Sequence, residues 1–231
     1  FLKHYDFATK IFIYYNFSTD NIVEIALKDS RCEIIYFSSK FDDIINQTIK
    51  NNCWKEHRDQ CDYCIVGDMD EFIWHPNNIY DILQKYKSND NVFSLFPVKG
   101  YNMVSENINL DIDKYLYKQI QKGCYSKDYS KINMFCPYSI INMNYSPGSH
   151  ICKPTSFNSK IIFGPVIILL HYKFIANINM LKKRYNDYSK RISKINIDNN
   201  FGIQYSNYNI YEKQYYNTLQ NSKKLEIFDK T

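Results

Sequence analysis

The chain has 231 residues, of which 45% are hydrophobic and 23% charged, with only 6 glycines and 6 prolines. This composition excludes collagen-like, disordered and low-complexity proteins, and the length is sufficient for one large α/β domain with its own core. The formal net charge is +5, from 29 basic and 24 acidic residues. Nucleic-acid-binding proteins usually carry more positive charge on one face, so we expect no nucleic-acid partner.

Strands and helices are predicted to alternate through the first hundred residues. Short apolar runs predict strands at 10–15, 33–37, 62–67 and 92–98. Apolar residues at helical spacing predict helices at 22–28, 41–49 and 78–87. This alternation is typical of an α/β fold with a mostly parallel sheet and helices on both faces.

The second part of the chain is predicted to be more irregular. The pattern is lost from 100 to 128, which indicates loops and short helices. Apolar runs then predict short strands at 131–135, 139–144, 160–163 and 166–172. A helix follows from 178 to 188, and the polar tail after 207 is predicted to be a loosely packed helix. Neither a repeat nor a linker is evident, so residues 1–231 are predicted to form a single domain.

The cysteine pattern indicates a reducing compartment. The seven cysteines are an odd number with irregular spacing, which disfavours a disulfide scaffold. Cys61 and Cys64 form a CxxC pair, and with Cys53 and His57 they raise the alternative of a zinc site. Residues three apart in a strand face opposite sides, however, so we do not expect the pair to share a metal.

No targeting or membrane-spanning segment is recognisable in the sequence. No apolar run reaches the ~18 residues of a membrane span, and no signal peptide is recognisable. We therefore expect a cytoplasmic location. The helix at 178–188 has a basic face that extends to Lys194, so peripheral contact with an anionic membrane is a further expectation.

An acidic cluster directly follows the predicted strand at 62–67. Side chains alternate along an extended chain, so Asp68 and Asp70 are expected to point to one side and Glu71 to the other. Ligands of open α/β sheets bind beyond the carboxyl ends of strands. Two carboxylates ~5 Å apart repel by roughly 3 kcal/mol, so a divalent cation, a proton or a basic side chain should offset the repulsion. The alternative is a solvated acidic turn in which Asp68 caps the next element.

The segment CDYCIVGDMDEF, residues 61–72, resembles the signature of family-2-like glycosyltransferases with the GT-A fold. Further segments resemble motifs of that family in the same order between residues 10 and 205, namely 16–21, 50–55, 100–105, 148–150, 169–173 and 184–196. The opening strand of the family, which carries an Asn-Glu pair near the nucleotide, is not recognisable in this sequence.

The resemblance implies a fold and a reaction. The fold would be a GT-A-like (Rossmann-like), mostly parallel sheet flanked by helices, with a smaller mixed C-terminal part. Residues 1–98 would bind the nucleotide, 99–205 would complete the acceptor and metal sites, and 206–231 would be a polar tail. The reaction would be metal-dependent, inverting transfer of a sugar from a nucleotide-diphosphate donor, with a UDP-sugar favoured, to a glycan or other hydroxyl acceptor.

The resemblance also implies a metal site. Asp68 and Asp70 would hold Mn²⁺ or Mg²⁺ through carboxylate oxygens. His171, in the segment LLHYK, would be a further ligand. The alternative for His171 is a histidine hydrogen-bonded at the end of a strand.

Substrate contacts and a catalytic base complete the implied site. The residues expected to contact the donor or acceptor are Asn16, Ser18, Asp20, Lys50, Asp68 and Tyr101. Asp20 could instead cap the following helix, and Tyr101 could instead belong to the core. An inverting transfer needs a general base, which the spacing does not identify. His150 is one option, and the others are Glu106, Asp111, Asp113 and Asp128, while Asp68 is a second expected catalytic residue. A different class of function, a non-catalytic GT-A-like domain that binds a sugar nucleotide or glycan, remains an alternative.

Overall fold

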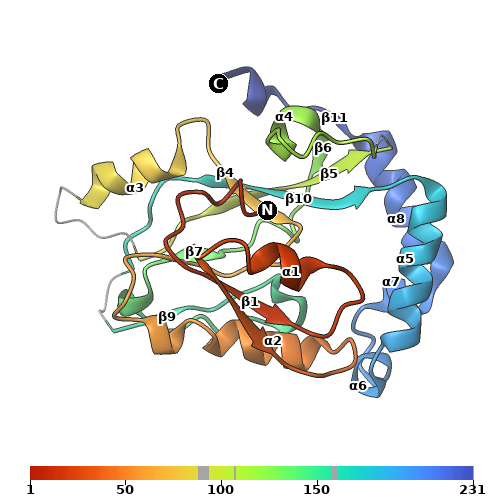
Figure 1. Cartoon of the computed structure of the whole chain (residues 1–231), viewed down its shortest axis with the longest axis horizontal. Coiled ribbons are helices and arrows are strands. Elements are labelled where there is room, and N and C mark those ends of the chain that lie inside the picture. Colours follow the sequence, from red (N-terminus) through yellow and green to blue (C-terminus); the bar gives the residue numbers. More distant parts are fainter. Residues whose placement is uncertain (88–93, 107, 158–160, 231) are drawn as a thin grey trace.

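The computed structural model describes residues 1–87, 94–106, 108–157 and 161–230, and the fold is α/β (Figure 1). The strands are β1 (Ile11–Tyr15), β2 (Cys32–Tyr36), β3 (Cys64–Ile65), β4 (Glu71–Trp74), β5 (Val98–Ser105), β6 (Lys122–Tyr125), β7 (Met134–Phe135), β8 (Ile140–Asn142), β9 (Thr155–Ser156), β10 (Ile167–Ile175) and β11 (Lys223–Lys224). The α-helices are α1 (Ile22–Ala26), α2 (Asp43–Asn52), α3 (Ile79–Lys87), α4 (Leu116–Gln119), α5 (Ile178–Arg191), α6 (Lys194–Asp198), α7 (Ile203–Ser206) and α8 (Tyr208–Asn221). Short 3₁₀ turns lie at Lys55–His57, Pro137–Ser139, Pro147–Ser149 and Glu226–Lys230.

The largest sheet is mixed, whereas the sequence predicted a mostly parallel one. Its five strands lie in the order β11-β6-β5-β10-β4, and among the described pairings of this sheet only β5–β10 is parallel. The strands β1 and β2 form a separate parallel pair, and β3 pairs antiparallel with β7. A mostly parallel sheet is not seen, because β4 pairs antiparallel with β10, β6 pairs antiparallel with β5, and β11 pairs antiparallel with β6.

The elements with strong local patterns lie where the sequence predicted them. These are β1, β2, α2, α3, β10 and α5. The predicted strands at 131–135 and 139–144 shrink to β7 and β8. The predicted strand at 92–98 lies partly outside the described residues, and only Val98 belongs to a strand, the start of β5. The predicted strand at 160–163 also begins outside them, and Phe163 there forms a single bridge with Leu95.

Two predictions for the irregular regions are wrong. Residues 100–128 contain most of β5 and all of β6 besides the short helix α4 that was predicted there; β5 forms because Tyr101 and Met103 point to one core cluster while Val104 points to another. The tail helix α8 is not loosely packed. Its Tyr211 and Tyr215 are fully buried with Phe174 and Leu181, so α8 and α5 pack together against the ends of β5 and β10 (Figure 1).

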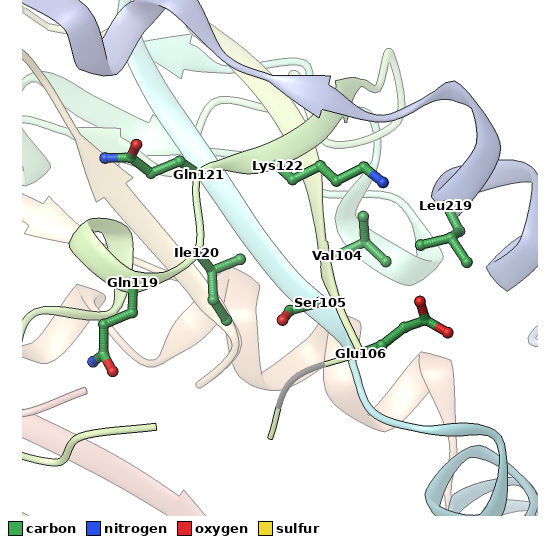
Figure 2. Close-up of a pocket in the computed structure, with 8 residues that line it drawn as sticks. All are labelled: Val104, Ser105, Glu106, Gln119, Ile120, Gln121, Lys122 and Leu219. Carbon is green, nitrogen blue, oxygen red and sulfur yellow. The ribbon is translucent and has the colours of Figure 1, made fainter. Parts of the chain in front are cut away.

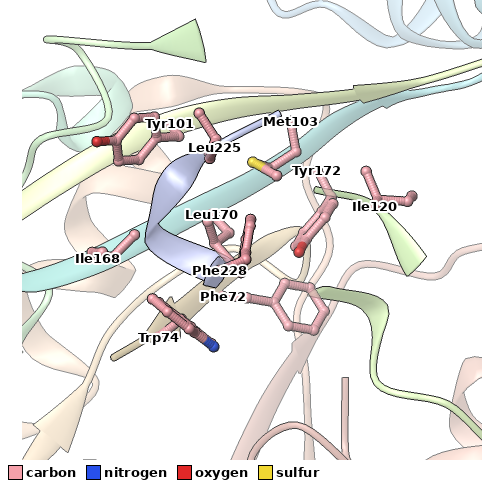
Figure 3. Packing of buried hydrophobic residues seen from close by; sticks show 10 residues of the cluster. All are labelled: Phe72, Trp74, Tyr101, Met103, Ile120, Ile168, Leu170, Tyr172, Leu225 and Phe228. Atoms are coloured by element: carbon pink, nitrogen blue, oxygen red, sulfur yellow. The ribbon is translucent and has the colours of Figure 1, made fainter. Parts of the chain in front are cut away.

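The sheet is buried on both faces around β4. Phe72 and Trp74 join one cluster with Leu170 and Tyr172 of β10 (Figure 3), and Leu225 and Phe228 cover that cluster. Ile73 points to the opposite face and packs in a second cluster. Because successive side chains of a strand face opposite sides, β4 is held between two apolar layers and fixes the end of the acidic turn.

Helix α2 is fixed at its N-terminus by polar contacts. The Asp42 side chain accepts hydrogen bonds from the backbone N–H groups of Ile44 and Ile45, which caps the helix. The Asn196 side chain accepts a hydrogen bond from the Asp43 N–H at 2.9 Å and donates one to the Asp43 carboxylate at 3.0 Å. These contacts hold α2, and with it Lys50, against the segment that contains α6.

Gly100 should not tolerate a side chain. A Cβ there would overlap the Tyr129 carbonyl group and lie 2.7 Å from the backbone N of Ser130. The Gly100 N–H also donates to Ser130 Oγ at 3.0 Å, which holds the two segments together. We therefore expect Gly100→Ala to lower the free energy of unfolding by about 3 kcal/mol. Urea denaturation measures this, with Lys99→Ala on the same strand as an exposed control expected to stay within about 0.5 kcal/mol of the parent. Equal effects of the two substitutions would contradict the close approach at Gly100.

Candidate functional site

A row of polar side chains crosses three neighbouring strands on one face of the sheet. His171 of β10 is in register with Glu71 of β4 and with Asn102 of β5. The residues next to them in sequence, including Leu170 and Tyr101, point to the other face and fill the core cluster of Figure 3. The strand alternation therefore places three polar groups together at the edge of the acidic turn.

The acidic turn is held by its own backbone and by β10. The Glu71 N–H donates to the Asp68 carbonyl at 3.0 Å, and the Asp68 N–H donates to the Glu71 carboxylate at 3.2 Å. The Tyr172 N–H donates to the Asp70 carbonyl at 2.8 Å. The side chains of Asp68 and Asp70 remain 44% and 48% exposed, so both carboxylates are open to a ligand.

His171 lies against Asp70 and is oriented by Asn102. Its Nε2 is 3.5 Å from Asp70 Oδ2, and its Nδ1 is 2.8 Å from Asn102 Oδ1. Since that Asn102 oxygen is an acceptor, Nδ1 donates to it, and Nε2 faces the Asp70 carboxylate, where a protonated nitrogen donates a hydrogen bond and an unprotonated one offers a lone pair to a metal ion. The Tyr129 ring stacks on the imidazole with centroids 3.7 Å apart. Only 4% of the His171 side chain is exposed.

Two buried lysines compensate the acidic residues. Lys50 Nζ is 2.8 Å from Asp68 Oδ1, and Lys131 Nζ is 2.6 Å from Glu71 Oε1. Both lysine side chains are buried. Enclosure by the protein opposes ionisation of Asp68, but Lys50, Lys131 and His171 outweigh it and hold the pKa of Asp68 below its usual value. Burial also raises the pKa of Asp70, but the interactions with His171 outweigh burial, so the pKa of Asp70 lies below its usual value.

The donor atoms fit a hard divalent cation in part. Asp70 and His171 offer a carboxylate oxygen and an imidazole nitrogen side by side, a donor set that suits Mn²⁺. Asp68 faces Lys50 instead, and among the residues the structure describes no group of three His, Cys, Asp or Glu side chains is placed to hold a metal ion. The repulsion between the two carboxylates was expected to be offset by a divalent cation, a proton or a basic side chain. At Asp68 the structure provides a basic side chain, that of Lys50.

His150 is connected to this site through one aromatic ring. Its Nδ1 lies 2.9 Å from the Asp128 carbonyl oxygen. Its ring meets Tyr129 edge-on with centroids 5.5 Å apart, and Tyr129 in turn stacks on His171. The His150 residue is exposed, so a ligand in solution can approach it.

The other sequence-predicted residues have structural contacts. The Asn16 side chain bonds both backbone groups of Ser39, and the Ser18 carbonyl accepts from Tyr15 Oη at 2.6 Å. Asp20 accepts from the Ile22 N–H at 3.4 Å, at the start of α1. Within the part of the chain that the structure describes, no hydrogen bond or ion pair joins Asn16, Ser18 or Asp20 to the acidic turn. Tyr101 lies in the core, 7% exposed, and its neighbour Asn102 faces the site instead.

Sequence reasoning missed Asn102, Tyr129 and Lys131. Asn102 had a usable signal, because it alternates with the apolar residues Tyr101 and Met103 and therefore faces away from the core. Lys131 begins a short apolar run and carries no local sign of its pairing with Glu71. Tyr129 lies between the region predicted to be irregular, 100–128, and the strand predicted at 131–135, and its backbone closely approaches Gly100.

A pocket of about 220 Å³ lies elsewhere, between β5, β6 and α8 (Figure 2). Its lining residues are Val104, Ser105, Glu106, Gln119, Ile120, Gln121, Lys122 and Leu219. None of them belongs to the acidic turn or to its histidine and lysine partners. The candidate site is therefore identified by its charged side chains and their contacts, and not by the size of this pocket.

Comparison of the sequence with models of known protein families finds no match, and comparison with curated proteins finds none either. Among the described residues, no helix combines the length and the apolar character needed to cross a membrane.

Proposed function

We propose that the chain is a metal-dependent glycosyltransferase that moves a sugar from a nucleotide-diphosphate donor, with a UDP-sugar favoured, to a hydroxyl of a glycan. The observation that carries the proposal is the Asp70–His171 pair, 3.5 Å between Oδ2 and Nε2, beside the Lys50–Asp68 pair. A divalent cation and a buried lysine next to one another would match the negative charge of a diphosphate. The ordered motifs between residues 10 and 205 support the same function and a GT-A-like fold.

The residues of the site have separate roles in this proposal. Asp70 and His171 would hold Mn²⁺ or Mg²⁺, which acts as a Lewis acid on the diphosphate leaving group. Lys50 would exchange part of its contact with Asp68 for a phosphate oxygen, which leaves Asp68 to bind the donor or the cation. His150, exposed beside Tyr129, would accept the proton of the acceptor hydroxyl. Asn16, Ser18 and Asp20 would contact the nucleoside end of the donor.

One observation favours the second candidate, a domain that binds a sugar nucleotide or glycan without turnover. Lys50 already neutralises Asp68, so the site has fewer free carboxylates than a three-ligand cation site requires. Donor hydrolysis distinguishes the two functions. A transferase releases UDP from its donor in a metal-dependent way, whereas a binding domain is stabilised by the donor without releasing UDP.

We expect Mn²⁺ together with at least one UDP-sugar to raise the melting temperature of the protein, because a ligand that binds only the folded state stabilises it. At a donor concentration of 100 times Kd the stabilisation is about 2.7 kcal/mol, or roughly 5–10 °C for a chain of this size. Differential scanning fluorimetry of the full chain, with UDP-sugars and GDP-sugars in the presence and absence of Mn²⁺, measures the shift.

Asp70→Asn should abolish the Mn²⁺-dependent part of this shift and the accompanying UDP release. Asp187→Asn, which changes an exposed carboxylate on α5, is the matched control and should leave both unchanged. If the protein shows no shift with any sugar nucleotide, with or without metal, the transferase and the binding of a sugar nucleotide without turnover are both contradicted, and only the glycan-binding form of the second candidate stands.

A further inference from the structure

The CxxC pair has a geometry that the sequence did not predict. The Sγ atoms of Cys61 and Cys64 are 3.6 Å apart, and both residues are half-buried. The sequence predicted that the two residues lie in one strand and face opposite sides. This prediction is wrong, because β3 begins only at Cys64 and a bend at Asp62 turns Cys61 back toward Cys64.

This pair differs from the other cysteines of the chain. All seven cysteines lie in the described part of the structure and are free thiols, and within that part only Cys61 and Cys64 bring their sulfurs into contact. The chain also brings no third metal-ligating side chain to the pair among the described residues. A structural zinc site needs four ligands, so two thiols alone point to redox chemistry and not to a metal.

We propose that Cys61 and Cys64 form a reversible dithiol/disulfide site that reacts with low-molecular-weight disulfides such as oxidised glutathione. The sulfurs need to approach by only about 1.5 Å to reach the ~2.05 Å length of a disulfide bond. The approach involves a short segment between the Lys55–His57 turn and β3 and leaves the core strands in place. The site is independent of the proposed transferase activity.

The two thiols are expected to act in a fixed order. The hydrogen bond from Cys64 lowers the pKa of Cys61, although burial and the nearby Asp62 carboxylate raise it. The same hydrogen bond and then burial raise the pKa of Cys64. Since the thiolate is the nucleophile, Cys61 is the attacking residue. Cys53, whose pKa burial raises to about 11, is a poor competitor.

The chemical step balances with one disulfide of the oxidant. Cys61 Sγ⁻ attacks a sulfur of oxidised glutathione, forms a mixed disulfide and releases one glutathione thiolate. Cys64 then loses its proton to solvent, attacks Cys61 Sγ and releases the second glutathione. Two protein thiols are oxidised to one disulfide while one molecule of oxidised glutathione is reduced to two thiols.

The test is oxidation of the full chain with a series of oxidised-to-reduced glutathione ratios, followed by alkylation and peptide mass spectrometry. We expect the first intramolecular disulfide to join Cys61 to Cys64, with the loss of two of the seven thiols, and to be reversed by dithiothreitol. Cys64→Ser should trap glutathione on Cys61, whereas Cys61→Ser should leave Cys64 unmodified at the same ratio. Cys32→Ser, at another half-buried cysteine, should behave like the parent.

Three outcomes would overturn the proposal. The first is a protein that keeps all its thiols across the series, and the second is a first disulfide between other cysteines. The third is purified protein that contains zinc and whose Cys61 reacts only after a chelator removes the metal. None of these readouts involves a sugar nucleotide, so their result is separate from that of the transferase test.

Discussion

Lys131→Met is expected to lower the free energy of unfolding by about 3–5 kcal/mol, since it leaves a buried carboxylate without its partner. Lys131 and Glu71 have side-chain exposures of 3% and 1%, and their charged atoms are 2.6 Å apart. Without Lys131, Glu71 has to lose its charge or admit water into a packed interior, and both cost free energy. For a chain of this size the melting temperature should fall on the order of 10 °C.

A double substitution separates the loss of charge balance from the loss of lysine packing. Lys131→Met combined with Glu71→Gln removes both charges and should recover about half or more of the lost stability, because no isolated charge then remains. Lys10→Met is the control, since its ion pair with Glu33 is about half exposed and such pairs contribute less than about 1 kcal/mol. Urea denaturation gives all of these values. A double variant as unstable as Lys131→Met alone would show that the unpaired carboxylate is not the cause.

The sequence predicted those parts of the fold whose signal is local. The apolar run of β10 and the helical spacing in α2 and α5 need no knowledge of distant residues. The five-stranded sheet could not be predicted in this way. The segment EFIW continues the acidic turn in sequence, and it is a strand because it pairs with Ile168–His171 of β10, almost a hundred residues later.

The candidate site likewise contains residues that the sequence could identify and contacts between distant residues that it could not. Asp68 and Asp70 are predicted from their positions after an apolar run and His171 from the resemblance of its segment to a family motif, and the structure brings Asp70 and His171 together. Asn102 and His171 are 69 residues apart in sequence and meet only through the parallel pairing of β5 with β10. Lys50 was predicted to contact a diphosphate, and its ion pair with Asp68 depends on the way α2 packs beside the turn. Pairings between distant charged residues have no local pattern, so periodicity could not reveal them.

His171→Gln is expected to reduce Mn²⁺-dependent release of UDP from the donor at least about 100-fold if Asp70 and His171 hold the cation. Glutamine retains a polar side chain of similar length, but its amide is a much weaker ligand for Mn²⁺ than an imidazole nitrogen. This prediction rests on the proposed function, and the folded state is checked by circular dichroism and by the melting temperature without ligands. A variant that keeps the parental UDP release would exclude His171 as a ligand.

Asn102→Ala tests how His171 is held, because Asn102 contacts only the Nδ1 side of the ring, 2.8 Å away. An imidazole that loses such a partner can rotate and change tautomer, which typically weakens metal binding or activity about 10–100-fold. The expected signature is a higher Mn²⁺ concentration for half-maximal UDP release, with most of the activity restored at saturating Mn²⁺. Asn102→Asp, which keeps an acceptor oxygen, should retain a half-maximal concentration near that of the parent. A fall in the maximal rate with no change in the Mn²⁺ requirement would instead mean that Asn102 serves only the packing of the sheet.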